Sequence, residues 1–157
     1  MKAFSGIMIL LAFHASAAHA GTLYVGPAET YTTIQSAIDA SSNGDVIIVR
    51  DGTYTGTGNR DIDFKGKAIH VKSEHGPNKC TVDAWGMWDD YPFRGFVFWS
   101  GEGPDSILEG FTVTGGASQH GAGVECYRSS PIIVGNVFTE NTCYFSGGEC
   151  MSDTDRP

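Results

Sequence analysis

The residues best suited to chemistry gather in one aromatic segment, 85–94, near the middle of the chain. It combines indole and phenol rings with two adjacent carboxylates and a guanidinium group, on Trp85, Trp88, Asp89, Asp90, Tyr91 and Arg94. Aromatic faces stack on sugar rings, and neighbouring carboxylates accept hydrogen bonds from hydroxyls or bind a cation. The segment therefore predicts contact with carbohydrate. The alternative is that its rings fold back and seal the flank of the fold.

Two pairs of carboxylates are candidate ligands for a metal ion. Asp61 and Asp63 lie on the same side of the chain if their segment is extended. Glu125 and Glu149 occupy the same position in the matching segments Gly-Val-Glu-Cys and Gly-Gly-Glu-Cys, so they would stack within about 5 Å on adjacent strands. Ca²⁺ is the cofactor that such oxygen pairs suit. The alternative is that all four carboxylates are solvated surface groups.

The matching segments belong to a repeat. Cys126 ends the first and Cys150 the second, and Gly-Phe-Thr-Val-Thr at 110–114 recurs in the same order as Gly-Asn-Val-Phe-Thr at 135–139. Both recurrences share a period of roughly 24–25 residues, which indicates a repeat architecture. Because the units are short, β-branched and bounded by glycine, each turn is made of strands. The sequence therefore predicts an all-β solenoid, a parallel β-helix with coils of roughly 22–25 residues.

The four cysteines allow two interpretations. In an exported chain an even number suggests disulfides, with three pairings, whereas a solenoid core can also bury free thiols. If a bridge forms, Cys126–Cys150 is the first choice, because adjacent strands lie about 4.8 Å apart and a disulfide joins Cα atoms roughly 4.4–6.8 Å apart. The other two are Cys80 and Cys143. A zinc site built on cysteine is disfavoured, since the sequence has no Cys-x-x-Cys motif and no Cys/His cluster.

The two ends of the solenoid differ in the sequence. An amphipathic helix is predicted over 32–40, with Thr32 or Thr33 as its cap, and it suits the cover that an open first coil needs. Residues 151–157 are polar and offer no such cover. We therefore expect either a truncated piece of a longer solenoid, or self-association or a partner at an uncapped C-terminal coil.

Asn136 and Asn141 fall at one predicted corner. Inward-pointing asparagines at β-helix corners can hydrogen-bond the backbone of adjacent coils. The alternative is a plain surface turn.

Residues 1–20 have the features of a secretory signal. Lys2 precedes the apolar run 7–13, and Ala18-His19-Ala20 forms a cleavage site. The run is too short to span a bilayer and no second one follows, so we expect a secreted chain, extracellular, periplasmic or on the cell surface, that does not span a membrane. The expected divisions are a signal peptide at 1–20, an N-terminal strand and capping helix at 21–45, β-helix coils at 46–150 and a polar tail or truncation point at 151–157.

The charge balance restricts the partners. The chain has 10 Lys+Arg against 18 Asp+Glu, and without residues 1–20, whose only charged side chain is Lys2, the net charge is −9. Nucleic acids require basic grooves, so a nucleic-acid partner is not expected. An acidic sugar would need a divalent cation to bridge it to such a chain.

Several segments resemble a known superfamily. Residues 31–40, 44–49 and 51–54 are similar to the opening of right-handed parallel β-helix proteins of the pectin-lyase-like superfamily. Residues 110–114 and 129–138 resemble the coil repeats of its secreted bacterial members. The resemblance covers roughly residues 22–150 and implies a right-handed parallel β-helix. It does not specify a function, because one such fold carries many activities.

The catalytic motifs of the enzymatic relatives are not evident. Asp89-Asp90 and His120-Gly121 are the only echoes of the polygalacturonase pattern, and Asn-Thr-Asp and Arg-Ile-Lys are absent from the sequence. We therefore favour a non-catalytic module that binds carbohydrate or mediates surface interaction. The rival is a polysaccharide lyase or glycoside hydrolase, which needs carboxylates and a basic residue to converge from successive coils. The third hypothesis is an inactive, truncated solenoid.

Overall fold

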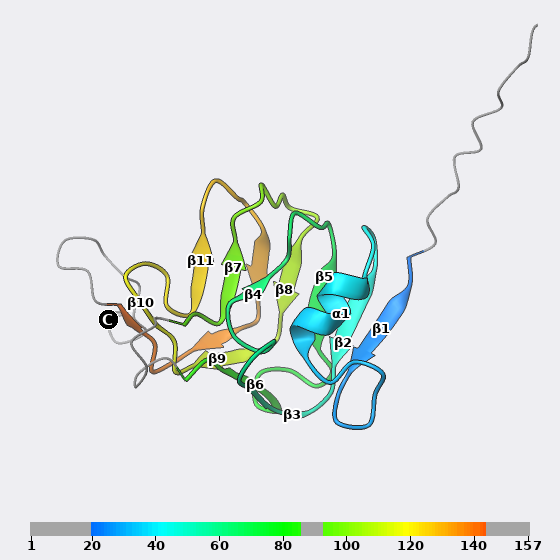
Figure 1. Ribbon diagram of the computed structural model, residues 1–157, viewed down its shortest axis with the longest axis horizontal. Helices are drawn as coiled ribbons and strands as arrows, with labels where there is room; N and C mark the ends of the chain where they lie inside the picture. The colour runs from blue at the N-terminus through cyan, green and yellow to red at the C-terminus, as the bar shows by residue number, and fades with distance from the viewer. Residues whose placement is uncertain (1–19, 86–92, 144–157) are drawn as a thin grey trace, which may run out of the picture.

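The strands of residues 20–85 and 93–143, which the computed structural model describes, wind into a β-solenoid of about four turns (Figure 1). Every ladder that joins two of these strands is parallel. The predicted all-β parallel solenoid is thereby confirmed. Within the described ranges, no helix has the length and apolar character needed to cross a bilayer.

Four parallel sheets form the walls. The first sheet comprises β1 (Thr22–Val25), β2 (Val46–Val49), β5 (His70–Ser73), β8 (Ile107–Glu109) and β12 (Ile132–Val134). The second comprises β3 (Gly52–Thr55), β6 (Cys80–Asp83), β9 (Thr112–Thr114) and β13 (Val137–Phe138). The third comprises β4 (Ile62–Asp63), β7 (Phe96–Phe98) and β11 (Val124–Cys126), and the fourth β10 (Ala117–Ser118) and β14 (Thr142–Cys143).

The strand register measures the length of each coil. Thr112 pairs with Val137 and Ala117 with Thr142, so the last two coils are offset by one period of the repeat, as its recurring glycines predict. The preceding coil contains more residues, because His70 pairs with Ile107, which is further along the sequence than one period. The extra length includes the aromatic segment 85–94, which lies between β6 and β7 in the sequence.

The predicted capping helix is α1 (Ile34–Ala40), and Thr33 is its N-cap. The Thr33 hydroxyl accepts a hydrogen bond from the Ser36 backbone N–H at 3.3 Å, which satisfies one of the unpaired donors of the first turn. One face of the helix is buried: Ile34, Ala37 and Ile38. This face packs against β1, β2 and β4, so the helix closes the first end of the solenoid (Figure 1).

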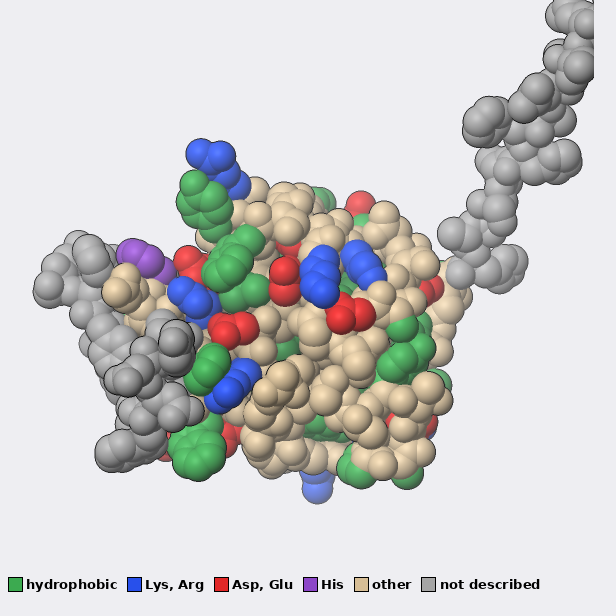
Figure 2. Space-filling view, viewed as in Figure 1, with side chains coloured by type: hydrophobic (Ala, Val, Ile, Leu, Met, Phe, Trp, Pro, Cys, Tyr) green, Lys and Arg blue, Asp and Glu red, His purple; other side chains and the backbone are tan. Residues whose placement is uncertain are grey.

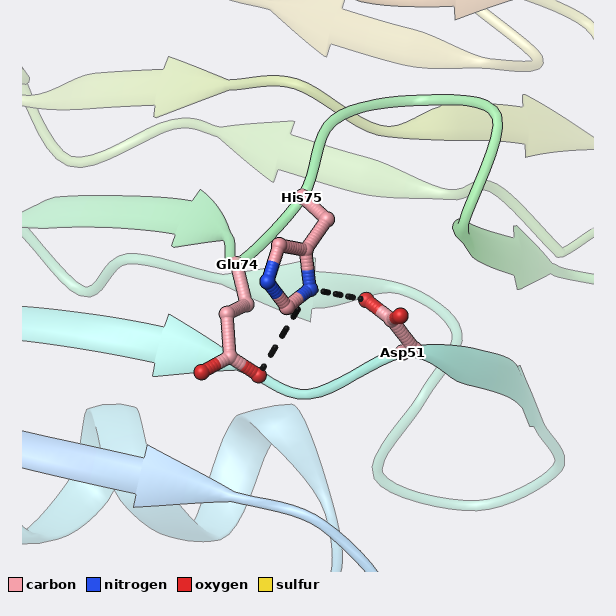
Figure 3. Close-up of side chains that lie close together, drawn as sticks. All are labelled: Asp51, Glu74 and His75. Carbon is pink, nitrogen blue, oxygen red and sulfur yellow. Dashed lines mark hydrogen bonds and ion pairs between the residues drawn. The ribbon is translucent and has the colours of Figure 1, made fainter.

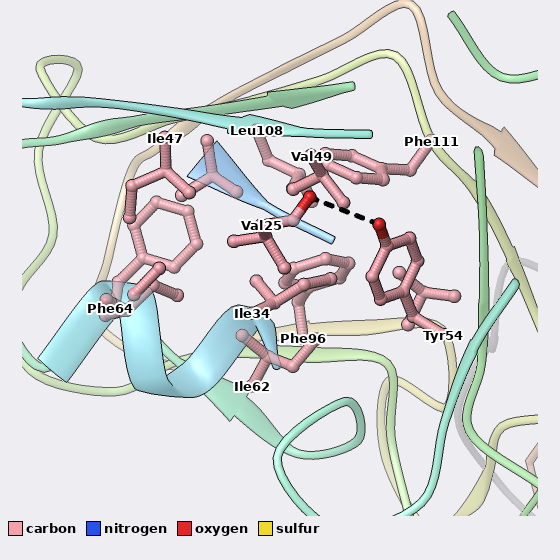
Figure 4. Packing of buried hydrophobic residues seen from close by; sticks show 14 of the residues in the cluster. Val25, Ile34, Ile47, Val49, Tyr54, Ile62, Phe64, Phe96, Leu108 and Phe111 are labelled. Atoms are coloured by element: carbon pink, nitrogen blue, oxygen red, sulfur yellow. Dashed lines mark hydrogen bonds between the residues drawn. The ribbon is translucent and has the colours of Figure 1, made fainter. Parts of the chain in front are cut away.

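The core is a column of apolar side chains inside the coils (Figure 4). Ile47, Val71 and Leu108 occupy matching register positions on successive strands, and all three are fully buried. Aromatic pairs fill the space beside them, with ring centroids 4.6 Å apart for Phe64 and Phe98. Burying each such side chain stabilises the fold by about 1.5–3 kcal/mol.

Asparagine side chains join the corners of neighbouring coils. Asn136 Oδ1 accepts from the Phe111 N–H at 2.8 Å, and its Nδ2 donates to the Leu108 carbonyl at 2.9 Å. Asn141 repeats the arrangement with the Gly116 N–H and the Val113 carbonyl. The role of these amides in binding the backbone of the adjacent coil is therefore confirmed, and the plain-turn alternative is wrong.

Glu102 joins three coils through one buried carboxylate, which is 2 % exposed. Its oxygens accept from the Gly66 N–H at 2.8 Å, the Ser100 N–H at 2.9 Å and the Ser129 hydroxyl at 2.8 Å. Burial alone raises the pKa of Glu102, but these hydrogen bonds outweigh it and hold the pKa of this carboxyl below its usual range.

The last described coil leaves apolar side chains open to solvent. Ile133 occupies the register position of Leu108, yet Ile133 is 37 % exposed and Leu108 fully buried. β12 pairs with β8 on one side, and no strand of the described ranges pairs with its other side. Its neighbours Ile132 and Val134 are exposed as well.

The predicted Cys126–Cys150 bridge is wrong, because Cys126 carries a free thiol. Cys143 forms a disulfide instead, and Cys150 lies outside the described residues. The prediction considered only the spacing of equivalent positions, whereas Cys143 lies on a different wall, opposite Ser118 in the fourth sheet. Cys80 is a free thiol in the core, where burial, with a smaller effect of Asp51, raises its pKa to about 12.

Candidate functional site

The outer surface of β4, β7 and β11, here called the third-sheet face, carries the candidate site (Figure 2). Phe96 and Phe98 of β7 point into the core, so Val97 between them points outward. In the register, Val97 lies between Asp63 on one neighbouring strand and Glu125 on the other. Figure 2 shows hydrophobic, acidic and basic side chains interspersed over these strands.

Arg94 lies at the centre of this face and joins residues of three successive coils. Its backbone N–H donates to Asp61 Oδ1 at 2.8 Å, and the Asp61 N–H donates to the Arg94 carbonyl at 2.7 Å. Its guanidinium Nη1 lies 3.8 Å from the same Asp61 oxygen, and its Nε lies 2.5 Å from Glu125 Oε2. The two carboxylates and the guanidinium therefore converge on one place.

The pairing of Arg94 with Glu125 is an ion pair without hydrogen-bond geometry. The Arg94 Nε–H donates instead to the His120 carbonyl at 3.3 Å, and Glu125 Oε2 has no hydrogen-bond partner although it is buried. The two side chains are only 17 % and 19 % exposed, so solvent screens this pair less than a surface pair.

Two exposed aromatic rings lie beside this cluster. Trp99 is 47 % exposed, and its ring centroid lies 5.3 Å from the Arg94 guanidinium carbon. Tyr127 is 55 % exposed, and its N–H donates to the carbonyl of Phe98, so it lies one coil beyond Trp99. Equivalent positions on adjacent strands are about 4.8 Å apart, so Trp99 and Tyr127 are neighbours along the sheet, and we call these two residues the aromatic strip. The Arg128 guanidinium carbon lies 5.2 Å from the Tyr127 ring centroid, as that of Arg94 lies near Trp99. Because Arg94 reaches both Glu125 and Trp99, its side chain crosses Val97, which is only 2 % exposed.

This arrangement suits the recognition of a hydroxylated ring. Exposed aromatic faces stack on the apolar faces of sugars, and carboxylates and guanidinium groups accept from and donate to hydroxyls. Acid–base hydrolysis needs an acid and a base that are free to exchange protons with substrate. Here Asp61 and Glu125 both contact Arg94, so each carboxylate of the described cluster is paired with a guanidinium group.

The structure separates the residues of the predicted aromatic site. Arg94 lies at the centre of the third-sheet face, as described above. Trp85 is 67 % exposed at the end of β6, where its N–H donates to Asp83 Oδ1, and no contact described in the structure joins it to Arg94. The other predicted members lie outside the described residues: Trp88, Asp89, Asp90 and Tyr91.

The premise for an Asp61–Asp63 metal pair is wrong. Asp61 has φ of +46°, so the segment is not extended there, and its carboxylate binds Arg94. Asp63 Oδ1 accepts from the Lys65 N–H at 2.7 Å and closes a local turn. Glu125 faces Arg94, and its proposed partner Glu149 lies outside the described residues.

Sequence reasoning missed Trp99 and Tyr127. Each comes directly after a strand of the third sheet, and the register pairs Phe96 of one strand with Val124 of the other. This offset is longer than the period of the visible repeat, from Gly110 to Gly135, so the repeat does not align the two rings. An alignment of Phe96-Val97-Phe98-Trp99 with Val124-Glu125-Cys126-Tyr127 would have found them.

An open hollow lies elsewhere, at the beginning of the first-sheet strands, with a volume of about 460 Å³. His70 lines it and pairs with Glu109 at 2.7 Å between Nε2 and Oε2. None of the residues predicted to contact carbohydrate lines it.

No protein-family model, curated protein or solved structure matches this chain.

Proposed function

We propose that this chain is a secreted β-solenoid module that binds carbohydrate on the third-sheet face. The observation that carries the proposal is the exposed strip of Trp99 and Tyr127 beside Arg94 and Glu125, on adjacent coils of a rigid wall. Two rings at the spacing of one coil offer successive stacking surfaces to a sugar chain.

The sequence supports the same proposal independently. Residues 1–20 have the features of an export signal, and the coil segments resemble secreted pectin-lyase-like proteins. Export would bring the third-sheet face into contact with extracellular or cell-surface glycans. The acidic character of the chain favours a neutral sugar over an acidic one.

A polysaccharide lyase or glycoside hydrolase is the second candidate. The observation in its favour is that Asp61, Arg94 and Glu125 come from three successive coils and converge. This is the arrangement that such an enzyme would need on a solenoid. Turnover of a glycan that the chain binds, lost in Glu125→Gln, would favour the enzyme over the binding module.

A glycan array probed with the purified chain, with and without Ca²⁺, tests the binding function. We expect a defined group of glycans to bind, and the double substitution Trp99→Ala/Tyr127→Ala to weaken binding at least 10-fold, because both stacking faces are lost. Trp85→Ala is the matched control, since it removes an exposed indole outside the third-sheet face.

Two results would contradict the proposal. One is no binding by a chain that circular dichroism shows to be folded, which would favour an incomplete solenoid. The other is equal binding by the double variant and by the wild type, which would place the ligand on another surface. Loss of binding only in Trp85→Ala would mean that the ligand binds the aromatic segment 85–94 and not the third-sheet face.

A further inference from the structure

A second group of side chains lies away from the third-sheet face, at the turns that follow β2 and β5. Asp51 follows β2, and Glu74 and His75 follow β5 (Figure 3). Val49 pairs with Ser73, so the register stacks these two turns one coil apart. One donor atom from each of the three side chains lies within 4.8 Å of the other two.

From this geometry we propose that Asp51, Glu74 and His75 bind one divalent transition-metal ion, with Zn²⁺ as the best match. His75 Nδ1 lies 2.9 Å from Asp51 Oδ1 and 3.9 Å from Glu74 Oε2. Two ligands of a tetrahedral Zn²⁺ ion, each roughly 2.0–2.2 Å from the metal, lie about 3.4 Å apart. The observed separations bracket this value, so small rotations of three exposed side chains complete the set.

A neighbouring arginine orients the Glu74 carboxylate. Arg50 donates through Nη1 to Glu74 Oε1 and through Nε to Glu29 Oε1, the latter at 2.8 Å. Its guanidinium carbon also lies 4.4 Å from the ring centroid of Tyr24. One oxygen of Glu74 is thereby occupied, and the other faces His75 (Figure 3). Outer hydrogen bonds that hold a ligating carboxylate in this way are typical of metal sites.

The local charge also matches a divalent ion. Glu29, Asp51 and Glu74 carry three carboxylates against the single guanidinium of Arg50, which leaves two formal negative charges beside the His75 imidazole. An imidazole nitrogen with two carboxylates suits Zn²⁺ better than Ca²⁺, which prefers oxygen ligands only. Three protein ligands leave a fourth position to water, as exposed sites of this kind do.

The ion would fasten the first coil to the second at a corner that the bare chain joins by surface ion pairs, Arg50 with Glu74 and His75 with Asp51. Because the ion binds the folded chain and not separate turns, it stabilises the fold in proportion to its occupancy. This proposal is independent of carbohydrate binding, since it uses no residue of the third-sheet face.

Isothermal titration of the purified chain, free of a polyhistidine tag and treated with a chelator, tests the site. We expect one equivalent of Zn²⁺ to bind, with Ca²⁺ at least 10-fold weaker, and the melting temperature to rise by about 10 °C at 100-fold excess over Kd. His75→Gln and Asp51→Asn should each weaken Zn²⁺ binding at least 10-fold and abolish the thermal shift.

Two controls identify the ligands. His70→Gln removes an imidazole that pairs with one carboxylate only, and it should leave Zn²⁺ binding unchanged. Cys126→Ser removes the exposed free thiol that offers a competing ligand, and it should also leave binding unchanged. Saturable binding that survives both His75→Gln and Asp51→Asn, or no saturable binding up to about 1 mM Zn²⁺, would overturn the proposal.

Discussion

Single charged side chains hold successive coils together in this protein. Glu102 binds groups from three coils through its two oxygens, and Arg94 contacts Asp61 and Glu125 on the coils to either side. Removing one partner of such a buried group leaves the others unsatisfied, which costs more than the hydrogen bond itself contributes. Charged residues therefore contribute to stability here, and they do so at the corners and on the third wall.

We expect Glu102→Gln to lower the free energy of unfolding by about 2 kcal/mol at pH 7, because an amide cannot accept from all three donors. The pKa of Glu102 is lowered in the folded chain, so its contribution is fully present above the unfolded value and is lost as the pH falls through the lower folded value. Urea unfolding between pH 7 and pH 3 measures this, and the difference between variant and wild type should shrink with acidification.

Asp105→Asn is the control for Glu102, since it neutralises an exposed carboxylate in the same turn. We expect it to change stability by less than about 0.5 kcal/mol at any of these pH values. An equal loss in both variants would mean that net charge, and not the hydrogen bonds of Glu102, sets the effect.

At the residue scale, sequence reasoning identified groups but not all their partners. Asn136 and Asn141 are predicted correctly as bonding corners. Arg94 is identified as a candidate, but its partners Asp61 and Glu125 are not. Glu102 is not predicted, because nothing in Gly-Glu-Gly-Pro distinguishes a buried carboxylate from a solvated one. Its partners Gly66 and Ser129 lie in other coils, and only the folded register brings them together.

Among the elements, α1 depends on capping at both ends. Thr33 caps its N-terminus, and the Lys67 ammonium donates to the carbonyls of Ile38, Asp39 and Ser41 at its C-terminus. Lys67 comes from the corner that leads into the second coil, so the helix is tied to the solenoid by more than its apolar face. A helix this short would not persist in water without such contacts.

The sequence leaves Thr32 and Thr33 as alternative caps, and their substitution distinguishes them. We expect Thr33→Ala to lower the free energy of unfolding by about 1 kcal/mol and Thr32→Ala by less than about 0.5 kcal/mol, because only Thr33 accepts from the Ser36 N–H. Thermal unfolding followed by circular dichroism measures both. Equal effects would show that the hydroxyl of Thr33 does not contribute as a cap.

The sequence predicts the order of the elements better than it predicts the length of each coil. The helix, the first rung at 46–49 and the last two coils follow from amphipathic and glycine-bounded patterns. The second coil could not be aligned, since the inserted segment 85–94 lengthens the sequence interval from β4 to β7. The interval from β7 to β11 also differs from the period of the visible repeat. The third-sheet face depends on that alignment, which is why its two aromatic residues were missed.

For the molecule as a whole, the two ends are unequal, and one pair of residues tests this. Leu108 and Ile133 are register partners, the first fully buried and the second 37 % exposed. We expect Leu108→Ala to cost about 2–5 kcal/mol and Ile133→Ala about 1 kcal/mol or less, since only the first creates a cavity. Urea unfolding compares them, and equal costs would mean that Ile133 is buried in solution.

The open side of β12 also predicts how the chain behaves at high concentration. Exposed apolar side chains beside unpaired backbone groups favour association of strand edges. We expect Ile132→Lys to reduce concentration-dependent association, measured by light scattering after size-exclusion chromatography. Thr53→Lys, a change to an exposed side chain on β3 at the opposite end of the second sheet from β13, is the control. Association that is unchanged in Ile132→Lys would exclude the β12 edge as its cause.

A helix that closes one end gives the solenoid a direction. Among the described strands, we expect opening to begin at the end that α1 does not cover, so protection of amide protons from exchange should fall from β2 through β5 and β8 to β12. The coils would then unfold in order, starting from the end opposite α1. A protease or a pulling force would then separate the last described coil before the walls near α1.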